Sequence, residues 1–163
     1  MAPILRAGGS LALSALLLAG CAQQPVRPTD VAAEFYSGRL ALQVEGQQSQ
    51  SFSASFELQG NSRRGELTLS TPIGGTVAAL EWTEGGATLK QGSQVREFPS
   101  LEALASQAAG TPIPVAALFD WLRGVNTPVA GWEADLTQLA EGRIRARRSD
   151  PPPAADLRVA LDR

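Results

Sequence analysis

The sequence predicts a mainly β fold, an antiparallel sheet with two helices inserted late in the chain. Apolar and polar side chains alternate with a period of two in six short segments between residues 35 and 98. Tight turns join these segments, as is typical of an antiparallel meander. The period changes to that of a helix between residues 100 and 124, and three strand-like segments follow. The helices are therefore expected to cover one face or one mouth of the sheet.

The first 20 residues form a targeting signal. Arg6 supplies a positive charge, and the apolar stretch at residues 11–19 is too short to span a bilayer. The stretch ends in Leu-Ala-Gly-Cys at residues 18–21, which is similar to a bacterial lipobox. Cys21 is the only cysteine of the chain, so we expect it to carry the lipid and to begin the mature protein. An ordinary secretory signal is the alternative, but a lone free thiol is unusual in a secreted protein.

Three parts follow from this organisation: a signal peptide at residues 1–20, a lipidated N-terminus with a flexible tether at residues 21–30, and one domain at residues 31–163. The tether is polar and contains two prolines. In enterobacteria, an aspartate directly after the lipidated cysteine retains a lipoprotein in the inner membrane. This chain has Ala22 at that position. By that analogy the chain is expected in the outer membrane.

The composition excludes several kinds of chemistry. The chain has no histidine, and its single cysteine is assigned to lipid. Imidazole acid–base catalysis, Cys or His metal sites and Ser-His or Cys-His nucleophile pairs are thereby removed. The formal net charge is −2, so no basic excess indicates nucleic-acid binding. We expect neither an enzyme nor a cofactor, and no metal site.

Six strands are expected before the helices, at residues 35–44, 51–58, 67–70, 76–82, 87–91 and 95–98. In the second of these, Phe52, Ala54, Phe56 and Leu58 alternate with serines and a glutamate. Such a pattern is typical of a strand with one buried and one exposed face.

The loop at residues 71–75 joins the third and fourth strands and contains an unusual residue. Pro72, Gly74 and Gly75 have the backbone preferences of a tight turn. Ile73 is a β-branched hydrophobe where turn chemistry favours a polar residue. From the residues alone, its side chain either folds back onto the sheet or faces outward.

Two helices are expected after the sixth strand. Ser100 is suited to the N-cap of the first, with Glu102 in its first turn and Gly110 at its end. Pro114 is suited to the first position of the second, which runs to Gly124. The chain then returns to strands at residues 132–136, 143–147 and 157–161.

Several motifs resemble the LolB family of outer-membrane lipoproteins. Besides the lipobox, they include Leu-Ser-Thr-Pro-Ile-Gly-Gly at residues 69–75 and Gly-Thr-Pro-Ile-Pro-Val at residues 110–115. Leu-Phe-Asp-Trp-Leu-Arg-Gly at residues 118–124 and Gly-Trp at 131–132 follow in the family's order. The family usually has a longer final section with a tryptophan-containing strand, whereas this chain ends at Arg163.

The resemblance implies an incompletely closed antiparallel β-barrel, or half-barrel, with a helical lid over a hydrophobic cavity. It implies a monomer, anchored through Cys21 in the periplasmic leaflet of the outer membrane. Its implied partners are a LolA-like periplasmic carrier, acylated lipoproteins as cargo and outer-membrane lipids, with no nucleic acid. The protein would take lipoproteins from the carrier and insert them into the membrane without covalent chemistry.

The resemblance also assigns site residues. Pro72, Ile73 and Gly74 would form the loop that contacts membrane or cargo, where leucine is usual at the position of Ile73. Alternation along the strands independently places one set of apolar residues on the inner face of the sheet: Leu40, Leu42, Phe52, Phe56, Leu67, Leu69 and Leu80. Helical spacing places Leu118, Trp121 and Leu122 on one face of the second helix. Together with Trp82, these residues are expected to line the acyl-chain cavity that the resemblance implies.

Two other functions remain open. A structural lipoprotein could scaffold an envelope assembly, with a filled core and no acyl-chain binding, because the same apolar face would also suit an ordinary core. A hydrolase using paired carboxylates ranks last, since the acidic residues are scattered over turns and polar faces. Only an oversized, partly empty cavity would separate a lipid carrier from a scaffold.

Overall fold

The computed structural model describes residues 33–46 and 50–162. The expected signal peptide, Cys21 and the tether lie outside the described residues. Among the residues that are described, no helix has both the length and the apolar character needed to cross a membrane.

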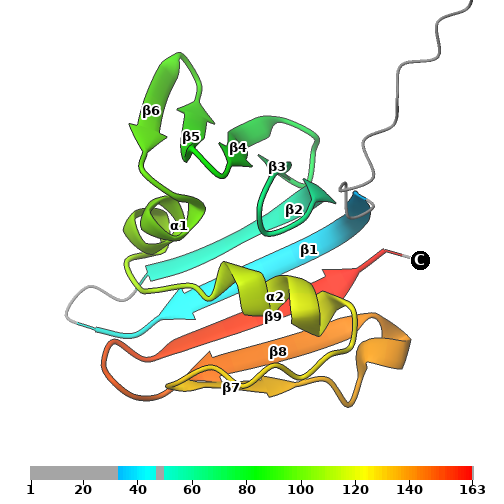
Figure 1. The fold of residues 1–163 in the computed structure, drawn as a ribbon. Helices are drawn as coiled ribbons and strands as arrows, with labels where there is room; N and C mark the ends of the chain where they lie inside the picture. The colour runs from blue at the N-terminus through cyan, green and yellow to red at the C-terminus, as the bar shows by residue number, and fades with distance from the viewer. Residues whose placement is uncertain (1–32, 47–49, 163) are drawn as a thin grey trace, which may run out of the picture. The chain divides into compact units, whose positions relative to one another are not determined.

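In the described part of the chain, nine strands form one antiparallel sheet, as the sequence predicts (Figure 1). Their order is β6-β5-β4-β3-β2-β1-β9-β8-β7, so β6 and β7 are the two edges and the sheet is not closed. The strands are β1 (Glu34–Val44), β2 (Gln50–Gly60), β3 (Gly65–Ser70), β4 (Thr76–Thr83), β5 (Gly86–Gln91), β6 (Gln94–Phe98), β7 (Trp132–Asp135), β8 (Arg143–Arg148) and β9 (Ala155–Leu161). The last strand returns to pair with the first, which places β9 beside β1 near the middle of the sheet.

The register aligns apolar residues in rows across the strands. Leu58, Leu67, Leu80 and Leu89 are successive partners on β2, β3, β4 and β5. Because side chains alternate along a strand, this row defines one apolar face, called here the inner face. The opposite, outer face carries the polar residues that alternate with them, such as Glu66 on β3 and its partner Glu81 on β4.

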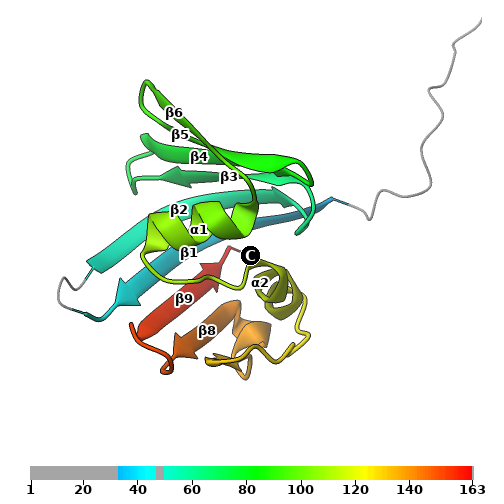
Figure 2. The same ribbon diagram turned by 60° about the vertical axis from the view of Figure 1, so that its left-hand side comes forward.

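Two helices lie on the inner side of the sheet (Figure 2). Helix α1 (Leu101–Ala109) begins at Ser100, whose hydroxyl accepts a hydrogen bond from the Ala103 N–H at 3.1 Å. It ends at Gly110, whose φ of +69° is the left-handed conformation that glycine adopts without strain. Both ends are as predicted.

Helix α2 (Val115–Leu122) is shorter than predicted. Pro114 is its N-cap residue and not its first helical residue, since its ψ of 77° is outside the helical range. A short 3₁₀ helix, η1 (Leu139–Glu141), was not predicted, and it ends at Gly142 just before β8. Its three residues are too few to produce a helical period in the sequence.

Candidate functional site

An apolar pocket of about 330 Å³ lies between the inner face of the sheet and the two helices. Strands β1 to β5 and β9 supply one wall, and both helices with the link between them supply the other. The lining residues are Leu40, Leu42, Val44, Gln50, Phe52, Phe56, Leu58, Leu67, Leu69, Val77, Ala78, Leu80, Trp82, Leu89, Gln91, Leu101, Ala105, Ala108, Ala109, Ile113, Val115, Leu118, Phe119, Leu122, Leu157 and Val159.

Small side chains on the helical side account for the empty volume. Helix α1 contributes Ala105, Ala108 and Ala109 to the wall, beside the larger Leu101. An alanine methyl group is too short to reach the leucine side chains on the inner face of the sheet. Space therefore remains that longer side chains on α1 would fill. Helix α2 contributes larger groups, including Leu118 and Phe119.

Ten of the eleven residues expected at the cavity line this pocket, Trp121 being the exception. Trp121 is almost completely buried elsewhere. Its indole N–H donates to the Thr127 carbonyl oxygen at 3.0 Å, and its ring lies 6.4 Å from that of Trp132. Helical periodicity placed Trp121 on the apolar face of α2, but that face is wide enough to meet two different surfaces.

The loop between β3 and β4 projects Ile73 outward. Its side chain is 96% exposed, which decides between the two orientations that the residues left open. The Gly74 N–H donates to the Thr71 carbonyl oxygen at 2.9 Å, and the Gly75 N–H donates to the Thr71 hydroxyl at 3.1 Å. The Thr71 N–H also donates to the Gly75 carbonyl oxygen at 2.8 Å, so hydrogen bonds within the turn give it a defined conformation with Ile73 directed away from the sheet.

Strand register places this loop at one particular end of the pocket. Ser70, the last residue of β3, is opposite Ser55, so the first residues of β2 extend past it toward the loop. Lys90 is opposite Ala79, so the end of β5 lies level with the start of β4. The loop, the start of β2 and the end of β5 therefore share one end of the sheet.

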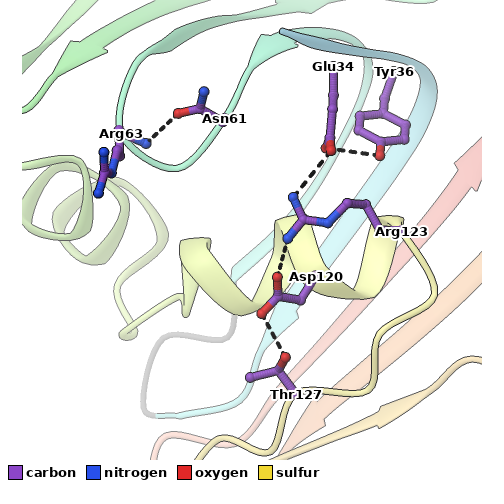
Figure 3. A network of polar contacts seen from close by, with 7 residues as sticks. All are labelled: Glu34, Tyr36, Asn61, Arg63, Asp120, Arg123 and Thr127. Carbon is purple, nitrogen blue, oxygen red and sulfur yellow. Dashed lines mark hydrogen bonds and ion pairs between the residues drawn. The ribbon is translucent and has the colours of Figure 1, made fainter. Parts of the chain in front are cut away.

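A polar network joins the end of α2 to the start of β1 (Figure 3). Arg123 bonds Glu34 at 3.2 Å and also pairs with Asp120. The Thr127 hydroxyl donates to Asp120 at 2.6 Å, and the Tyr36 hydroxyl donates to Glu34 at 3.1 Å. Burial, followed by this hydrogen bond and the charge of Glu34, raises the pKa of Tyr36 to about 12. The network fixes the position of α2 against β1.

On the outer face, arginines of β8 and β9 are ion-paired and partly exposed. Arg145, Arg147 and Arg158 surround Asp156. The hydrogen bond from Arg145, helped by Arg158, lowers the pKa of Asp156 to about 2 against the opposing effect of burial. These contacts favour a solvated, structural role for this strand face.

A larger hollow, of about 840 Å³, has a different character. It is lined in part by Glu66, Glu81 and Glu97 on the outer face of β3, β4 and β6, in one row with Thr88 of β5 between the last two. An acyl chain bound there would place hydrocarbon against these carboxylates, which is unfavourable because a charge loses free energy when it is moved from water into an apolar environment. The apolar pocket beneath the helices is therefore the better candidate site.

Comparison with known proteins agrees with these features. A family model described as outer membrane lipoprotein LolB matches residues 35–150. The outer-membrane lipoprotein LolB of Bordetella petrii is 40% identical over 173 residues, covering 89% of this chain and 86% of that protein. The corresponding protein of Cupriavidus metallidurans is 34% identical over 135 residues, covering 78% of this chain and 65% of its own length. That of Chromobacterium violaceum is 33% identical over 121 residues, covering 70% and 66%.

Proposed function

Because this chain belongs to the LolB family of outer-membrane lipoproteins, we propose that it receives acylated lipoproteins from a LolA-like periplasmic carrier and inserts them into the outer membrane. The apolar pocket is the acyl-chain cavity, and α1 with α2 is its lid. Cys21 carries the lipid that anchors the protein in the periplasmic leaflet.

One observation supports this function above the others: the space between sheet and helices is not filled. An apolar cavity of about 150 Å³ already takes up a benzene ring, and this pocket measures about 330 Å³. Apolar side chains that face an unfilled pocket lose the packing contacts that a filled core would give them, and this lowers stability. A scaffold with an ordinary core gains nothing from that cost, whereas a hydrocarbon carrier requires the space.

Acyl chains need such a carrier because their exposure to water is unfavourable. Burial of one methylene contributes about 0.8 kcal/mol, so a long acyl chain costs on the order of 10 kcal/mol to expose. Transfer between two proteins requires no nucleotide if the receiver binds the chain more tightly. About 1.4 kcal/mol of extra affinity biases the exchange about tenfold.

Ile73 supports the last step, insertion. Burial of an isoleucine side chain contributes roughly 1.5–3 kcal/mol, too little to anchor a protein that already has a lipid at Cys21. It is enough to favour local contact of the loop with the bilayer or with the cargo lipid. We assign Pro72, Ile73 and Gly74 to this contact.

The test is binding of a fluorescent fatty-acyl probe to the chain carrying Cys21→Ala, which has no lipid of its own to compete. We expect saturable binding, and displacement of the probe by a purified lipoprotein. Ala105→Phe, which fills the pocket from α1, should weaken probe binding by about tenfold or more, since a hydrocarbon loses the space it would occupy. The matched control is Ala116→Phe, at an exposed position of α2 outside the pocket.

The scaffold alternative predicts the opposite result. Absence of saturable probe binding would contradict the proposed function, as would equal binding by the unsubstituted chain and Ala105→Phe. Thermal unfolding of each variant separates loss of binding from loss of the fold.

A further inference from the structure

Among the described residues that line the pocket, two have polar side chains, Gln50 and Gln91, apart from Trp82 with its indole. The indole N–H is already used, because it donates to the Asn61 carbonyl oxygen at 2.8 Å. Gln50 begins β2 and Gln91 ends β5. Both glutamines thus lie at the end of the sheet that also carries the Ile73 loop.

The amide of Gln91 is oriented by a neighbouring strand. Arg96 on β6 donates from Nη2 to Gln91 Oε1 at 2.9 Å, and the Arg96 guanidinium itself lies over the Phe98 ring at 5.9 Å. An arginine can only donate, so the Gln91 oxygen is engaged and its NH₂ group remains as a donor. Such a group suits a carbonyl oxygen.

Gln50 is placed where α1 ends. A Cβ built on Gly110, the C-cap residue, would lie 3.8 Å from Gln50 Oε1 and 3.9 Å from Nε2. The Gln50 amide therefore lies beside the last turn of α1, where Ala108 and Ala109 line the pocket. Among the described residues, no side chain or backbone group forms a hydrogen bond with this amide.

A bound lipid has requirements that match this arrangement. Its hydrocarbon tail gains by leaving water, but the carbonyl groups that join tail to headgroup lose free energy if they are buried without a donor. From the two glutamines to Trp82 and Phe119, the pocket is lined by apolar side chains, against which a hydrocarbon tail can pack. Of the lining residues that the structure describes, those whose side-chain N–H groups remain available as donors lie at the glutamine end.

We propose that Gln50 and Gln91 form a polar rim that donates hydrogen bonds to the ester or amide carbonyls of the cargo lipid. The tails then enter the pocket from this end, with the linkages held at the rim. The inference rests on the proposed function and adds to it the direction of entry and the part of the lipid that is recognised. It also places the exposed Ile73 loop beside the entrance.

The test compares two lipids that differ only in their linkage. One is a synthetic diacyl lipid with ester carbonyls, and the other is its dialkyl ether counterpart with chains of the same length. Each competes with the fluorescent acyl probe for the Cys21→Ala chain, with and without the pair Gln50→Leu and Gln91→Leu. The matched control is Gln59→Leu, an exposed glutamine on the outer face of β2.

We expect the double substitution to weaken binding of the ester lipid by about three- to thirtyfold, the range for one or two net hydrogen bonds. Binding of the ether lipid should not weaken, and Gln59→Leu should change neither. If the double substitution weakens binding of both lipids equally, or does not weaken binding of the ester lipid, the glutamines do not recognise the carbonyls. The proposed function would remain intact in either case. If the unsubstituted chain binds neither the probe nor either lipid, the proposed function fails and the rim with it.

Discussion

Arg148 on β8 is buried and donates from Nη1 to the Thr111 hydroxyl at 3.1 Å. The same nitrogen donates to the Pro153 carbonyl oxygen at 2.8 Å, and no carboxylate pairs with Arg148 in the part of the chain that the structure describes. Thr111 belongs to the link between α1 and α2, so one side chain of the sheet holds the position of both helices. A buried charge that bonds only neutral oxygens depends strongly on each of them.

Thr111→Val should therefore destabilise the protein. The substitution keeps the shape of the side chain but removes an acceptor from a buried guanidinium, and hydrogen bonds to charged groups contribute about 1.5–3 kcal/mol. We expect a loss of that size in the free energy of unfolding, measured by urea denaturation. Thr88→Val, on the outer face of β5, is the matched control and should change it by less than about 0.5 kcal/mol. Equal stability of the two variants would show that the Arg148–Thr111 bond is not needed.

Ile73→Glu should leave the fold and acyl binding intact but impair insertion of cargo into liposomes. Ile73 is 96% exposed, so the change removes no packing, but it places a charge where the loop would meet hydrocarbon. Loss of the burial of the isoleucine side chain, roughly 1.5–3 kcal/mol, corresponds to a reduction of about ten- to a hundredfold. The measurement is the amount of lipoprotein recovered with liposomes after transfer from the carrier.

Val95→Glu is the control for this loop. Val95 is also a β-branched hydrophobe and is 60% exposed, but it lies on the edge strand β6, outside the loop. Insertion should remain normal in this variant. Unchanged insertion by Ile73→Glu would remove the loop from the mechanism.

Asp156 should make the free energy of unfolding depend on pH in the acidic range. Its pKa is lowered from 3.8 to about 2, first by the hydrogen bond from Arg145 and also by Arg158. A carboxyl whose pKa is lower in the folded state stabilises the fold above about pH 4, and that contribution disappears as the pH falls toward 2. A tenfold change in an acid dissociation constant corresponds to about 1.36 kcal/mol. Because the arginines are partly exposed, solvent screening reduces the expected contribution to about 1–2 kcal/mol.

Asp156→Asn should lose this contribution at pH 7 and differ little from the unsubstituted chain near pH 2. Urea unfolding at pH 7, 4 and 2 measures the difference, with Asp162→Asn at an exposed position as the control. A difference between Asp156→Asn and the unsubstituted chain that stays constant with pH would contradict the assignment.

Local structure was readable from sequence because its signals are local. The period-two segments, the Ser100 N-cap and the Gly110 C-cap all depend on residues within a few positions of one another. The same alternation correctly indicated that Leu40, Phe56 and Leu67 face inward. The helical period was less decisive at Trp121, since it gives the direction of a side chain on the helix but not the surface that this side chain meets.

Other features depend on contacts between distant parts of the chain. The return of β9 to β1 and the two open edges of the sheet follow from pairing over more than a hundred residues. Exposure of Ile73 follows from the hydrogen bonds of its turn, and burial of Arg148 from the path of the α1–α2 link. Alternation of apolar residues shows which way side chains face but not how much of the enclosed volume they fill. The existence of the pocket, and the position of the two glutamines at its end, therefore depend on how the sheet and the helices pack together.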